Sequence, residues 1–472
     1  MNAGPHDAAG QARRWHADLA WLPGPGVCSD VLIEAVAGRF TAVTPGVAAA
    51  DLPPGTIRLA GLTLPGLANG HSHAFHRALR GITQAGKGSF WTWRDQMYRV
   101  AAGLDPDSYH ALARAVYAEM ALAGITCVGE FHYLHHGPGG TRYADRNEMS
   151  RALIAAAAEA GIRITLLDTC YLAGGIGADG RPEPLAGAQL RFGDGDSAAW
   201  AERADALGAD QHGVLGPDAR VGAAIHSIRA VPLDQVHHVV AWAQRYGAPL
   251  HLHLSEQPAE NQASLAAYRR TPAELLFEAG ALGPRTTAVH ATHLAGHDAE
   301  LLGGSRAHIC FCPTTEADLA DGIGPAAALA AAGCPLTLGT DSQAVIDLFE
   351  EARRVELHER LATMERGHFS AEELARAATL AGHASLGWPE AGEIAPGAMA
   401  DLVTLRPDSP RLAGLGRGTA LESVVFAATA ADVRSVVVCG RDVVSDGQHQ
   451  LVSDVPAALT AAVRGVLRAA EQ

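Results

Sequence analysis

The feature that most constrains the fold is a regular alternation of short apolar segments with alanine-rich segments of helical periodicity. Such alternation is typical of repeated strand and helix units around a parallel sheet. The helical segments at 109–124 and 149–161 both end in glycine, the residue favoured at a left-handed helix C-terminus. Eight apolar segments predict an α/β fold of the (β/α)8 TIM-like barrel type, and they span residues 62–73, 125–133, 163–171, 221–228, 249–256, 286–293, 308–313 and 335–342.

The ends of the chain show short strand patterns outside this alternation. A chain of 472 residues is long enough for a barrel and a smaller second unit. Neither end alone has enough strands for a stable sheet, so we expect both ends to combine into one small β domain. The predicted organisation is a β domain formed by residues 1–61 and 393–450, a barrel over 62–392 and a C-terminal helix over 451–472. Residues 174–217, rich in Gly, Pro and Asp, are predicted as a long mobile loop or an irregular insertion.

Polar residues gather at the carboxyl ends of the predicted strands, where barrel enzymes have their active sites. The first strand carries His71 and His73, which point to the same side because side chains alternate along a strand. The fifth strand carries His251 and His253, and the eighth ends near Asp341. Burying so many imidazole and carboxylate groups without partners is costly, so packing alone does not explain them. The set favours one divalent metal ion held by three nitrogens and one carboxylate oxygen, with Zn²⁺ preferred and iron as the alternative.

Further residues at the same rim fit roles in proton transfer. A bound ion of this kind lowers the pKa of its water and generates hydroxide. Glu256 is the natural group to carry the proton to the leaving group. Because Glu256 follows His253 by three residues, we expect His253 rather than His251 to be the ligand. His290 would polarise or orient the attacked centre, and Asp341 would serve both as ligand and as proton acceptor.

Composition excludes several other chemistries. Lys87 is the single lysine and lies in a polar segment, which excludes a Schiff-base lysine or a carboxylated lysine between two metals on a barrel strand. The formal charge of −15 argues against nucleic acid or an anionic membrane surface as a partner. No apolar stretch is long enough for a signal sequence or a membrane span, so we expect a cytoplasmic protein.

Several motifs together resemble a known family. "PGLANGHSHAF", "HLHLSEQ", "VHATH" and "GTDS" are similar to the amidohydrolase superfamily, and the lack of a lysine on the fourth strand agrees with its mononuclear aminohydrolases. "SFWTWRDQMYR", "EFHYLHH", "HSIRAV" and "CPTTEADLADGIGP" resemble the formimidoylglutamate deiminase family, over roughly residues 60 to 450. The resemblance implies hydrolysis of N-formimino-L-glutamate to N-formyl-L-glutamate and ammonia in histidine degradation, by a homodimer.

Carried over residue by residue, the resemblance implies a complete site. It gives the metal ligands as His71, His73, His253 and Asp341. It gives the catalytic pair as Glu256 and His290, and the substrate contacts as Arg94, Tyr133, His226 and Arg229. A small dicarboxylate substrate suits guanidinium groups, which bind carboxylates bidentately. Five basic residues stand against Asp95 alone between positions 77 and 100, so this stretch is expected to attract an acidic substrate.

One position departs from the resemblance. Where the family usually has glutamine, five residues after the first ligand histidine, this chain has His76. The replacement puts a ring that can titrate near neutral pH among the substrate contacts. It leaves another substrate open for the same chemistry, either another formimino amino acid or a nucleobase such as guanine. A non-catalytic metal-binding barrel is a further alternative, and Glu256 argues against it because a metal store needs no acid beside an open site.

Overall fold

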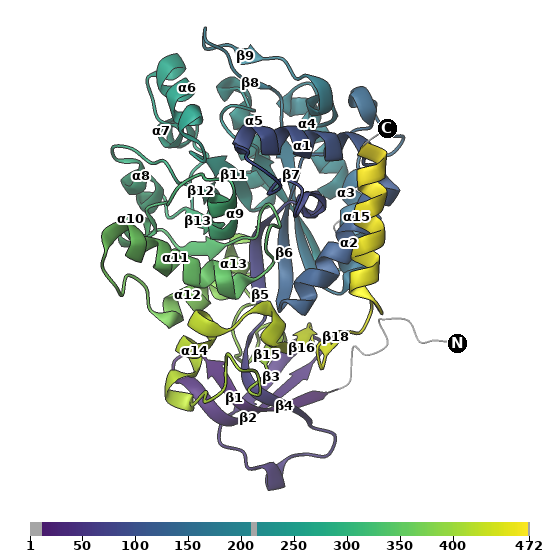
Figure 1. Cartoon of the computed structure of the whole chain (residues 1–472), viewed down its shortest axis with the longest axis vertical. Helices are drawn as coiled ribbons and strands as arrows, with labels where there is room; N and C mark the ends of the chain where they lie inside the picture. Colours follow the sequence, from purple (N-terminus) through teal and green to yellow (C-terminus); the bar gives the residue numbers. More distant parts are fainter. Residues whose placement is uncertain (1–11, 209–214, 471–472) are drawn as a thin grey trace.

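The computed structural model of the chain describes residues 12–208 and 215–470. It consists of a helix-covered barrel with a second β-sheet against one end of it (Figure 1). Parts of three predicted regions lie outside the described residues: 1–11 of the β domain, 209–214 of the insertion and 471–472 of the C-terminal helix.

The barrel is a sheet of eight strands in which all neighbouring pairs are parallel, which confirms the predicted (β/α)8 fold. Its first and last strands meet where Ser72 and Asp341 form a parallel bridge, and the amide of Asp341 donates to the carbonyl of His71. The strands are β5 (Leu67–Ser72), β6 (Ile125–His132), β7 (Arg163–Cys170), β10 (Ala219–Ile225), β11 (Leu250–Leu254), β12 (Thr286–His290), β13 (His308–Phe311) and β14 (Leu336–Leu338).

Most helices follow barrel strands and cover the outside of the barrel (Figure 1). Local signals explain several starts; the side chain of Asp105, for example, accepts from the amide of Ser108 at 2.8 Å and caps α2. None of the helices in the described part of the chain is long and apolar enough to cross a membrane. The helices are α1 (Phe90–Gly103), α2 (Pro106–Leu122), α3 (Glu148–Ala160), α4 (Ser197–Gly208), α5 (Leu233–Tyr246), α6 (Pro258–Tyr268), α7 (Pro272–Glu278), α8 (Asp298–Gly304), α9 (Pro313–Asp318), α10 (Ala326–Ala331), α11 (Leu348–Thr363), α12 (Ala371–Ala378), α13 (Leu380–Ser385), α14 (Ala420–Ala427) and α15 (Val455–Ala470).

The second sheet combines both ends of the chain, as predicted. Its order is β18-β17-β16-β15-β4-β1-β2-β3, and β4 joins the two ends by pairing with β1 on one side and β15 on the other. Its strands are β1 (Arg13–Leu22), β2 (Gly26–Val36), β3 (Arg39–Thr44), β4 (Ile57–Pro65), β15 (Leu402–Leu405), β16 (Val433–Val438), β17 (Arg441–Ser445) and β18 (Gln448–His449).

Two local predictions were wrong. The predicted strand 62–73 is two strands, because Pro65 ends β4 in the terminal sheet and β5 starts the barrel at Leu67. The chain crosses at Gly66, where a Cβ atom would lie 2.4 Å from the Thr126 side chain, so only glycine fits. The predicted loop 174–217 contains a short hairpin of β8 (Gly175–Ile176) and β9 (Pro182–Glu183), the 3-10 helix η4 (Gly187–Arg191) and α4. Its Gly and Pro content masked the helical segment, whose first turn is capped by Asp196.

Candidate metal centre and active site

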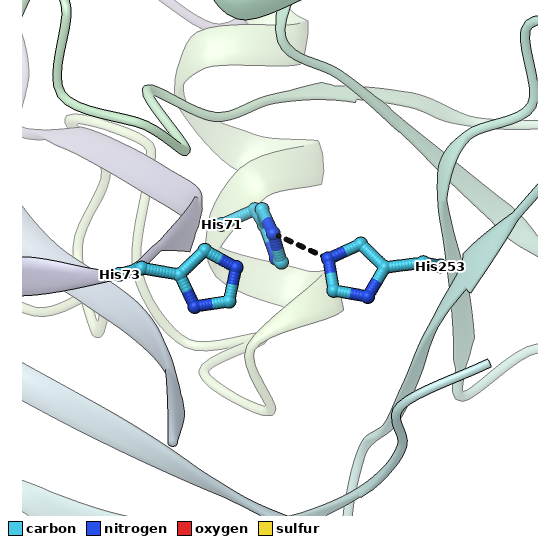
Figure 2. A group of neighbouring side chains, drawn as sticks. All are labelled: His71, His73 and His253. Carbon is cyan, nitrogen blue, oxygen red and sulfur yellow. Dashed lines mark hydrogen bonds between the residues drawn. The ribbon is translucent and has the colours of Figure 1, made fainter. Parts of the chain in front are cut away.

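Three histidines and one aspartate meet at the carboxyl ends of the barrel strands. His71 lies in β5 and His73 directly follows it, while His253 comes from β11 on the opposite side (Figure 2). Asp341 lies three residues beyond β14 and is brought to His71 by barrel closure. All four side chains are buried. The structure therefore brings together the four residues that were predicted as metal ligands.

The ligand atoms of these residues are spaced as a tetrahedral ion requires. Nε2 of His71 lies 3.2 Å from Nε2 of His253 and 3.4 Å from Oδ1 of Asp341. Nε2 of His73 lies 3.5 Å from the same carboxylate oxygen. An ion ~2.0 to 2.2 Å from each ligand separates tetrahedral ligands by roughly 3.3 to 3.6 Å. Three imidazoles and one carboxylate at this spacing fit one ion of the size of Zn²⁺.

The hydrogen bonds of the outer ring nitrogens set the protonation of the ligands. Nδ1 of His73 donates to the carbonyl of Phe131, and Nδ1 of His253 donates to the carbonyl of His226, each at 2.9 Å. Both Nε2 atoms therefore present lone pairs toward the centre of the group. Burial lowers the pKa of His71, His73 and His253, so all three rings are neutral. Neutral imidazoles are the form that binds a metal ion.

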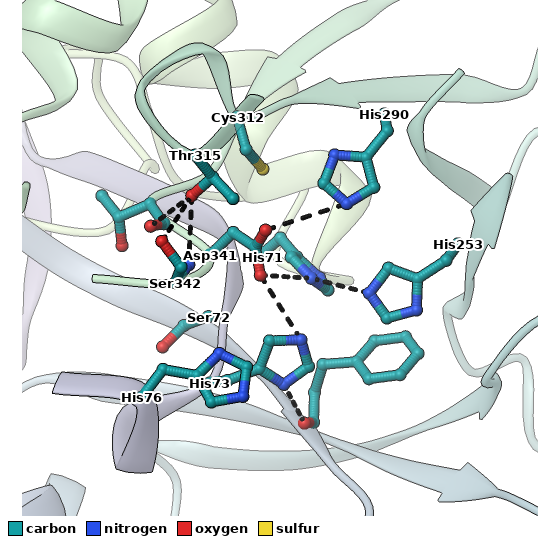
Figure 3. A network of polar contacts seen from close by, with 12 residues as sticks. His71, Ser72, His73, His76, His253, His290, Cys312, Thr315, Asp341 and Ser342 are labelled. Carbon is teal, nitrogen blue, oxygen red and sulfur yellow. Dashed lines mark hydrogen bonds and ion pairs between the residues drawn. The ribbon is translucent and has the colours of Figure 1, made fainter. Parts of the chain in front are cut away.

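The predicted catalytic residues lie beside this group. Nε2 of His290 is 3.8 Å from Oε1 of Glu256. The same nitrogen is 3.8 Å from Oδ2 of Asp341 (Figure 3). Burial lowers the pKa of His290, but the carboxylates of Glu256, Glu316 and Asp341 outweigh this effect and raise it to about 10. Burial raises the pKa of Glu256. Burial also acts to raise the pKa of Asp341, but the hydrogen bond from His71 and the positive charge of His290 outweigh it and hold this pKa below its usual range. The site thus combines an imidazolium, an ionised carboxylate and a carboxyl group able to carry a proton.

A single pocket is lined by Glu256, His290, Asp341 and all five residues predicted to contact the substrate, which are His76, Arg94, Tyr133, His226 and Arg229. The pocket holds about 530 Å³ of space, part of it open to solvent. Its mixed aromatic and charged lining is typical of a site for a small molecule.

His76 lies against the metal group but does not behave as the sequence suggested. Its Nε2 is 3.2 Å from the hydroxyl of Tyr133, and its ring centroid is 4.5 Å from that of His73. Burial lowers the pKa of His76 to about 3, so the ring is neutral at physiological pH. The prediction that this ring titrates near neutral pH was therefore wrong, because the side chain is fully enclosed.

The basic stretch 77–100 contributes one arginine to the pocket. Arg77 and Arg80 each bind the carboxylate of Glu119 at 2.7 Å. Arg94, in α1, instead lies with its guanidinium carbon 4.5 Å from the ring centroid of Trp91 and lines the pocket. The predicted preference for Arg94 over Arg77 and Arg80 agrees with these positions.

Three residues at the site were not singled out from the sequence. Glu316, in the first turn of α9, accepts from Nδ1 of His290 at 3.3 Å and from the amide of Cys312 at 2.9 Å. Tyr98 and Tyr171 also line the pocket. The spacing of four residues between Arg94 and Tyr98 on one helix was the available signal for the tyrosine.

The other histidines near the strand ends have different surroundings. His251 is 3.0 Å from the carbonyl of Ser385 through its Nε2, so it does not face the ligand group. His132 is the last residue of β6, and His135 and His136 follow this strand; His136 is 3.1 Å from Asp194. None of these four belongs to a possible metal-binding group among the described residues.

Comparisons with known proteins agree with this geometry. The model of the amidohydrolase family matches residues 62–443. The formimidoylglutamate deiminase of Pseudomonas aeruginosa is 37% identical over 425 residues, covering 87% of this chain and 92% of that protein. The 8-oxoguanine deaminase of the same organism is 30% identical over 365 residues, covering 75% of this chain and 76% of that protein.

Solved structures show the same fold. The crystal structure of an amidohydrolase from Brucella melitensis has a TM-score of 0.88 and 32% identity, covering 96% of this chain and 100% of that one. A zinc-bound adenosine deaminase from Xanthomonas campestris has a TM-score of 0.83 at 24% identity, covering 97% of this chain and 98% of that one, and supports the fold alone. The chain therefore belongs to the amidohydrolase family and is a hydrolase acting on C–N bonds.

Proposed function

We propose that the protein hydrolyses N-formimino-L-glutamate to N-formyl-L-glutamate and ammonia, in the degradation of histidine. The observation that carries the proposal is that Arg94 and Arg229 line the same pocket as Glu256 and the metal ligands. Within the described residues, neither arginine forms an ion pair, so both are available to the two carboxylates of this substrate. The identity of 37% to a formimidoylglutamate deiminase supports the same substrate.

The residues that would hold a metal ion are His71, His73, His253 and Asp341, and zinc is the ion we propose, with iron as the alternative. When bound, the ion supplies a nucleophile at neutral pH, because it lowers the pKa of the water that it binds. Outside the ligand set, the substrate contacts would come from His76, Tyr133, His226 and the two arginines.

Glu256 is the proposed proton carrier. Its oxygen lies 3.8 Å from Nε2 of His290, so both groups face the same small volume above Asp341. Asp341 accepts a proton from the attacking water, and Glu256 carries protons to the departing nitrogen. His290, as an imidazolium, polarises the attacked carbon. In the overall reaction, water oxygen becomes the formyl oxygen, the C–N bond to the imino nitrogen breaks, and both water hydrogens leave on ammonia.

The proposal is tested by measuring ammonia release from N-formimino-L-glutamate, N-formimino-L-aspartate and guanine with the zinc-loaded protein. We expect the glutamate compound to have the largest kcat/KM, and Arg94→Met or Arg229→Met to raise its KM by about tenfold or more. A larger kcat/KM on guanine, with KM unaffected by the arginine variants, would favour a nucleobase deaminase instead.

The Glu256→Gln variant separates an enzyme from a metal-binding barrel. We expect the variant to keep one metal ion per chain, measured by elemental analysis, and to lose about 10² to 10⁴ of kcat. Arg58→Gln, at an exposed ion pair with Asp18, is a control that should leave both quantities unchanged. Full turnover by Glu256→Gln would contradict the role of this carboxyl group.

We further propose that the protein acts in the cytoplasm as a homodimer, with neither nucleic acid nor membrane as a partner. Its formal charge of −15 supports the lack of anionic partners. Light scattering on the eluate of a sizing column measures the oligomeric state, and a monomer at micromolar concentration would contradict the dimer.

A further inference from the structure

We propose that Tyr98 and Tyr171, both oriented by Gln189, donate hydrogen bonds to a carboxylate of the substrate and so select dicarboxylates over monocarboxylates. The proposal rests on the proposed function, because it concerns the substrate of the same pocket. It assigns a role to the segment between β7 and β10, which the sequence presented only as a loop.

The orientation of the Gln189 amide is fixed by its three partners. This side chain lies in η4 and is buried. Its Oε1 accepts from the amide of Ala186 at 3.2 Å. Its Nε2 lies 3.1 Å from the hydroxyl oxygen of Tyr98 and 3.2 Å from that of Tyr171. Because the carbonyl oxygen is occupied, the two amide hydrogens point at the two phenol oxygens, one to each.

This arrangement makes the tyrosines donors toward the pocket. Each phenol oxygen accepts from Gln189 and carries one O–H hydrogen that must point elsewhere. The hydroxyls of Tyr98 and Tyr171 also bond to each other, so one O–H hydrogen is left for the pocket, and a carboxylate that replaces this bond would accept from both. Within the described residues, neither hydroxyl has a carbonyl or carboxylate acceptor, whereas both rings line the pocket. Burial raises the pKa of Tyr171, so this phenol keeps its proton at physiological pH.

The tyrosines stand beside the two arginines of the pocket. The guanidinium carbon of Arg94 is 5.6 Å from the ring centroid of Tyr98, four residues along the same helix. The ring of Tyr171 lies 4.4 Å from that of His226, which is three residues before Arg229. A carboxylate that enters between the arginines would therefore also meet uncharged O–H donors. Two donor types at one end of a pocket suit an anion with several lone pairs.

A buried guanidinium holds this wall of the pocket in place. Arg191, two residues after Gln189, donates to the carbonyls of Ala102 at 3.0 Å and Leu104 at 2.5 Å, and also to that of Ala101. These carbonyls lie at the end of α1, the helix that carries Tyr98 and Arg94. The same side chain donates to the carbonyl of His136 after β6, so η4 is attached to both α1 and the barrel.

The test compares Tyr98→Phe, Tyr171→Phe and Gln189→Leu on a dicarboxylate and on a monocarboxylate. With zinc-loaded enzyme, each variant should raise KM for N-formimino-L-glutamate by about tenfold or more, because a hydrogen bond to a charged group is lost. We expect kcat to stay within about twofold, and kcat/KM for N-formiminoglycine to change less than about threefold. Tyr246→Phe removes an exposed hydroxyl that binds Asp205, and this control should match the parent protein on both compounds.

Equal losses on both compounds would show that the tyrosines only maintain the fold, and unchanged KM would show that they do not contact the substrate; either result overturns the proposal. Calorimetric binding of N-formyl-L-glutamate separates this failure from that of the proposed function. If the parent protein releases no ammonia, the proposed function fails, but binding weakened about tenfold by Tyr171→Phe still supports the anion site. If parent and variants bind N-formyl-L-glutamate equally, or if the parent does not bind it, the proposed anion site is overturned.

Discussion

Two buried groups of histidine and aspartate lie near the same end of the barrel, and they differ in whether an arginine is bound to the aspartate. The ligand cluster consists of His71, His73, His253 and Asp341. The arginine cluster consists of His136, Asp168, Asp194 and Arg203. All eight side chains are buried.

The arginine cluster is complete without any ligand. Arg203 donates to Asp168 at 2.7 and 2.9 Å and to Asp194 at 2.9 to 3.1 Å. The indole nitrogen of Trp200 adds a bond of 2.9 Å to Asp168. Burial raises the pKa of Asp194, but the guanidinium of Arg203 outweighs it and holds this pKa below its usual range. Here the fixed positive charge of Arg203 is bound to two carboxylates. The cluster therefore has a structural role.

The ligand cluster has the opposite character. Three ring nitrogens and a carboxylate converge, and among the described residues no arginine or lysine donates to Asp341; its charged neighbour is the ring of His290, 3.8 Å away. Burial of histidines and acids is therefore not by itself the mark of a metal site in this protein. Converging ligand atoms to which no arginine or lysine is bound are the informative feature.

The strongest test of the difference between the two clusters is to remove one acid from each of them. Asp341→Asn should lower kcat by about 10³ or more, because the residue is proposed as both ligand and proton acceptor. Asp194→Asn should leave kcat per folded molecule within about threefold, since its carboxylate only balances Arg203. Steady-state ammonia release with measured metal content tests the pair, and a large loss of kcat in Asp194→Asn alone would reverse the assignment.

The second largest effect is on stability. Arg203→Met leaves two carboxylates buried without a cation and should lower the free energy of unfolding by about 3 to 5 kcal/mol. The matched control is Arg58→Met, whose partner Asp18 is at the surface, and there we expect a loss of about 0 to 1 kcal/mol. Denaturant unfolding measures the free energy of unfolding of both variants. Equal losses would mean that burial of the Arg203 ion pairs does not increase their contribution to stability.

Metal removal should affect only the ligand cluster. Free zinc at about 100 times its dissociation constant should stabilise the folded protein by ~2.7 kcal/mol relative to chelated protein. The same shift is expected in Arg203→Met, whose ligand cluster is intact, and it should vanish in Asp341→Asn. A full zinc shift in Asp341→Asn would remove this carboxylate from the ligand set.

The two clusters were not equally predictable from the sequence. Residues of the ligand cluster come from strand ends, so period-two alternation and the count of eight strands were enough to place them at one rim. Members of the arginine cluster come from the loop after β6, from β7, from α4 and from the loop before α4. Their pairing depends on how the segment 174–208 folds back on the barrel, which no local pattern records.

Other features that could not be predicted from the sequence have the same physical origin. Arg77 pairs with Glu119 over 42 residues and Gln189 binds Tyr98 over 91 residues, so packing decides both contacts. The burial that keeps His76 neutral also follows from packing rather than from its neighbours in sequence. Local patterns thus predicted the strands and the polar residues at their ends. Contacts between residues far apart in sequence decided which charged side chains are paired within the protein.

The smallest expected effect concerns a histidine beside the arginine cluster. His132 is fully buried, and its ring nitrogens have no partner among the described residues. Burial and the neighbouring His135 lower the pKa of His132 well below the ordinary value for histidine. The unfolded chain therefore takes up a proton below about pH 6.5 that the folded chain does not, so this group reduces stability as pH falls, by up to ~1.4 kcal/mol per pH unit.

His132→Phe removes this proton uptake from the unfolded chain without removing a hydrogen bond from the folded one. Relative to the parent, the variant should therefore gain up to ~1.4 kcal/mol when the pH is lowered from about 7.5 to about 5.5. Denaturant midpoints at the two pH values, both measured with chelator present, test this difference while the ligand cluster is the same in both proteins. A difference between variant and parent that does not change with pH would mean that His132 takes up its proton in the folded protein as it does in the unfolded chain, and that a further positive charge lies beside the arginine cluster at low pH.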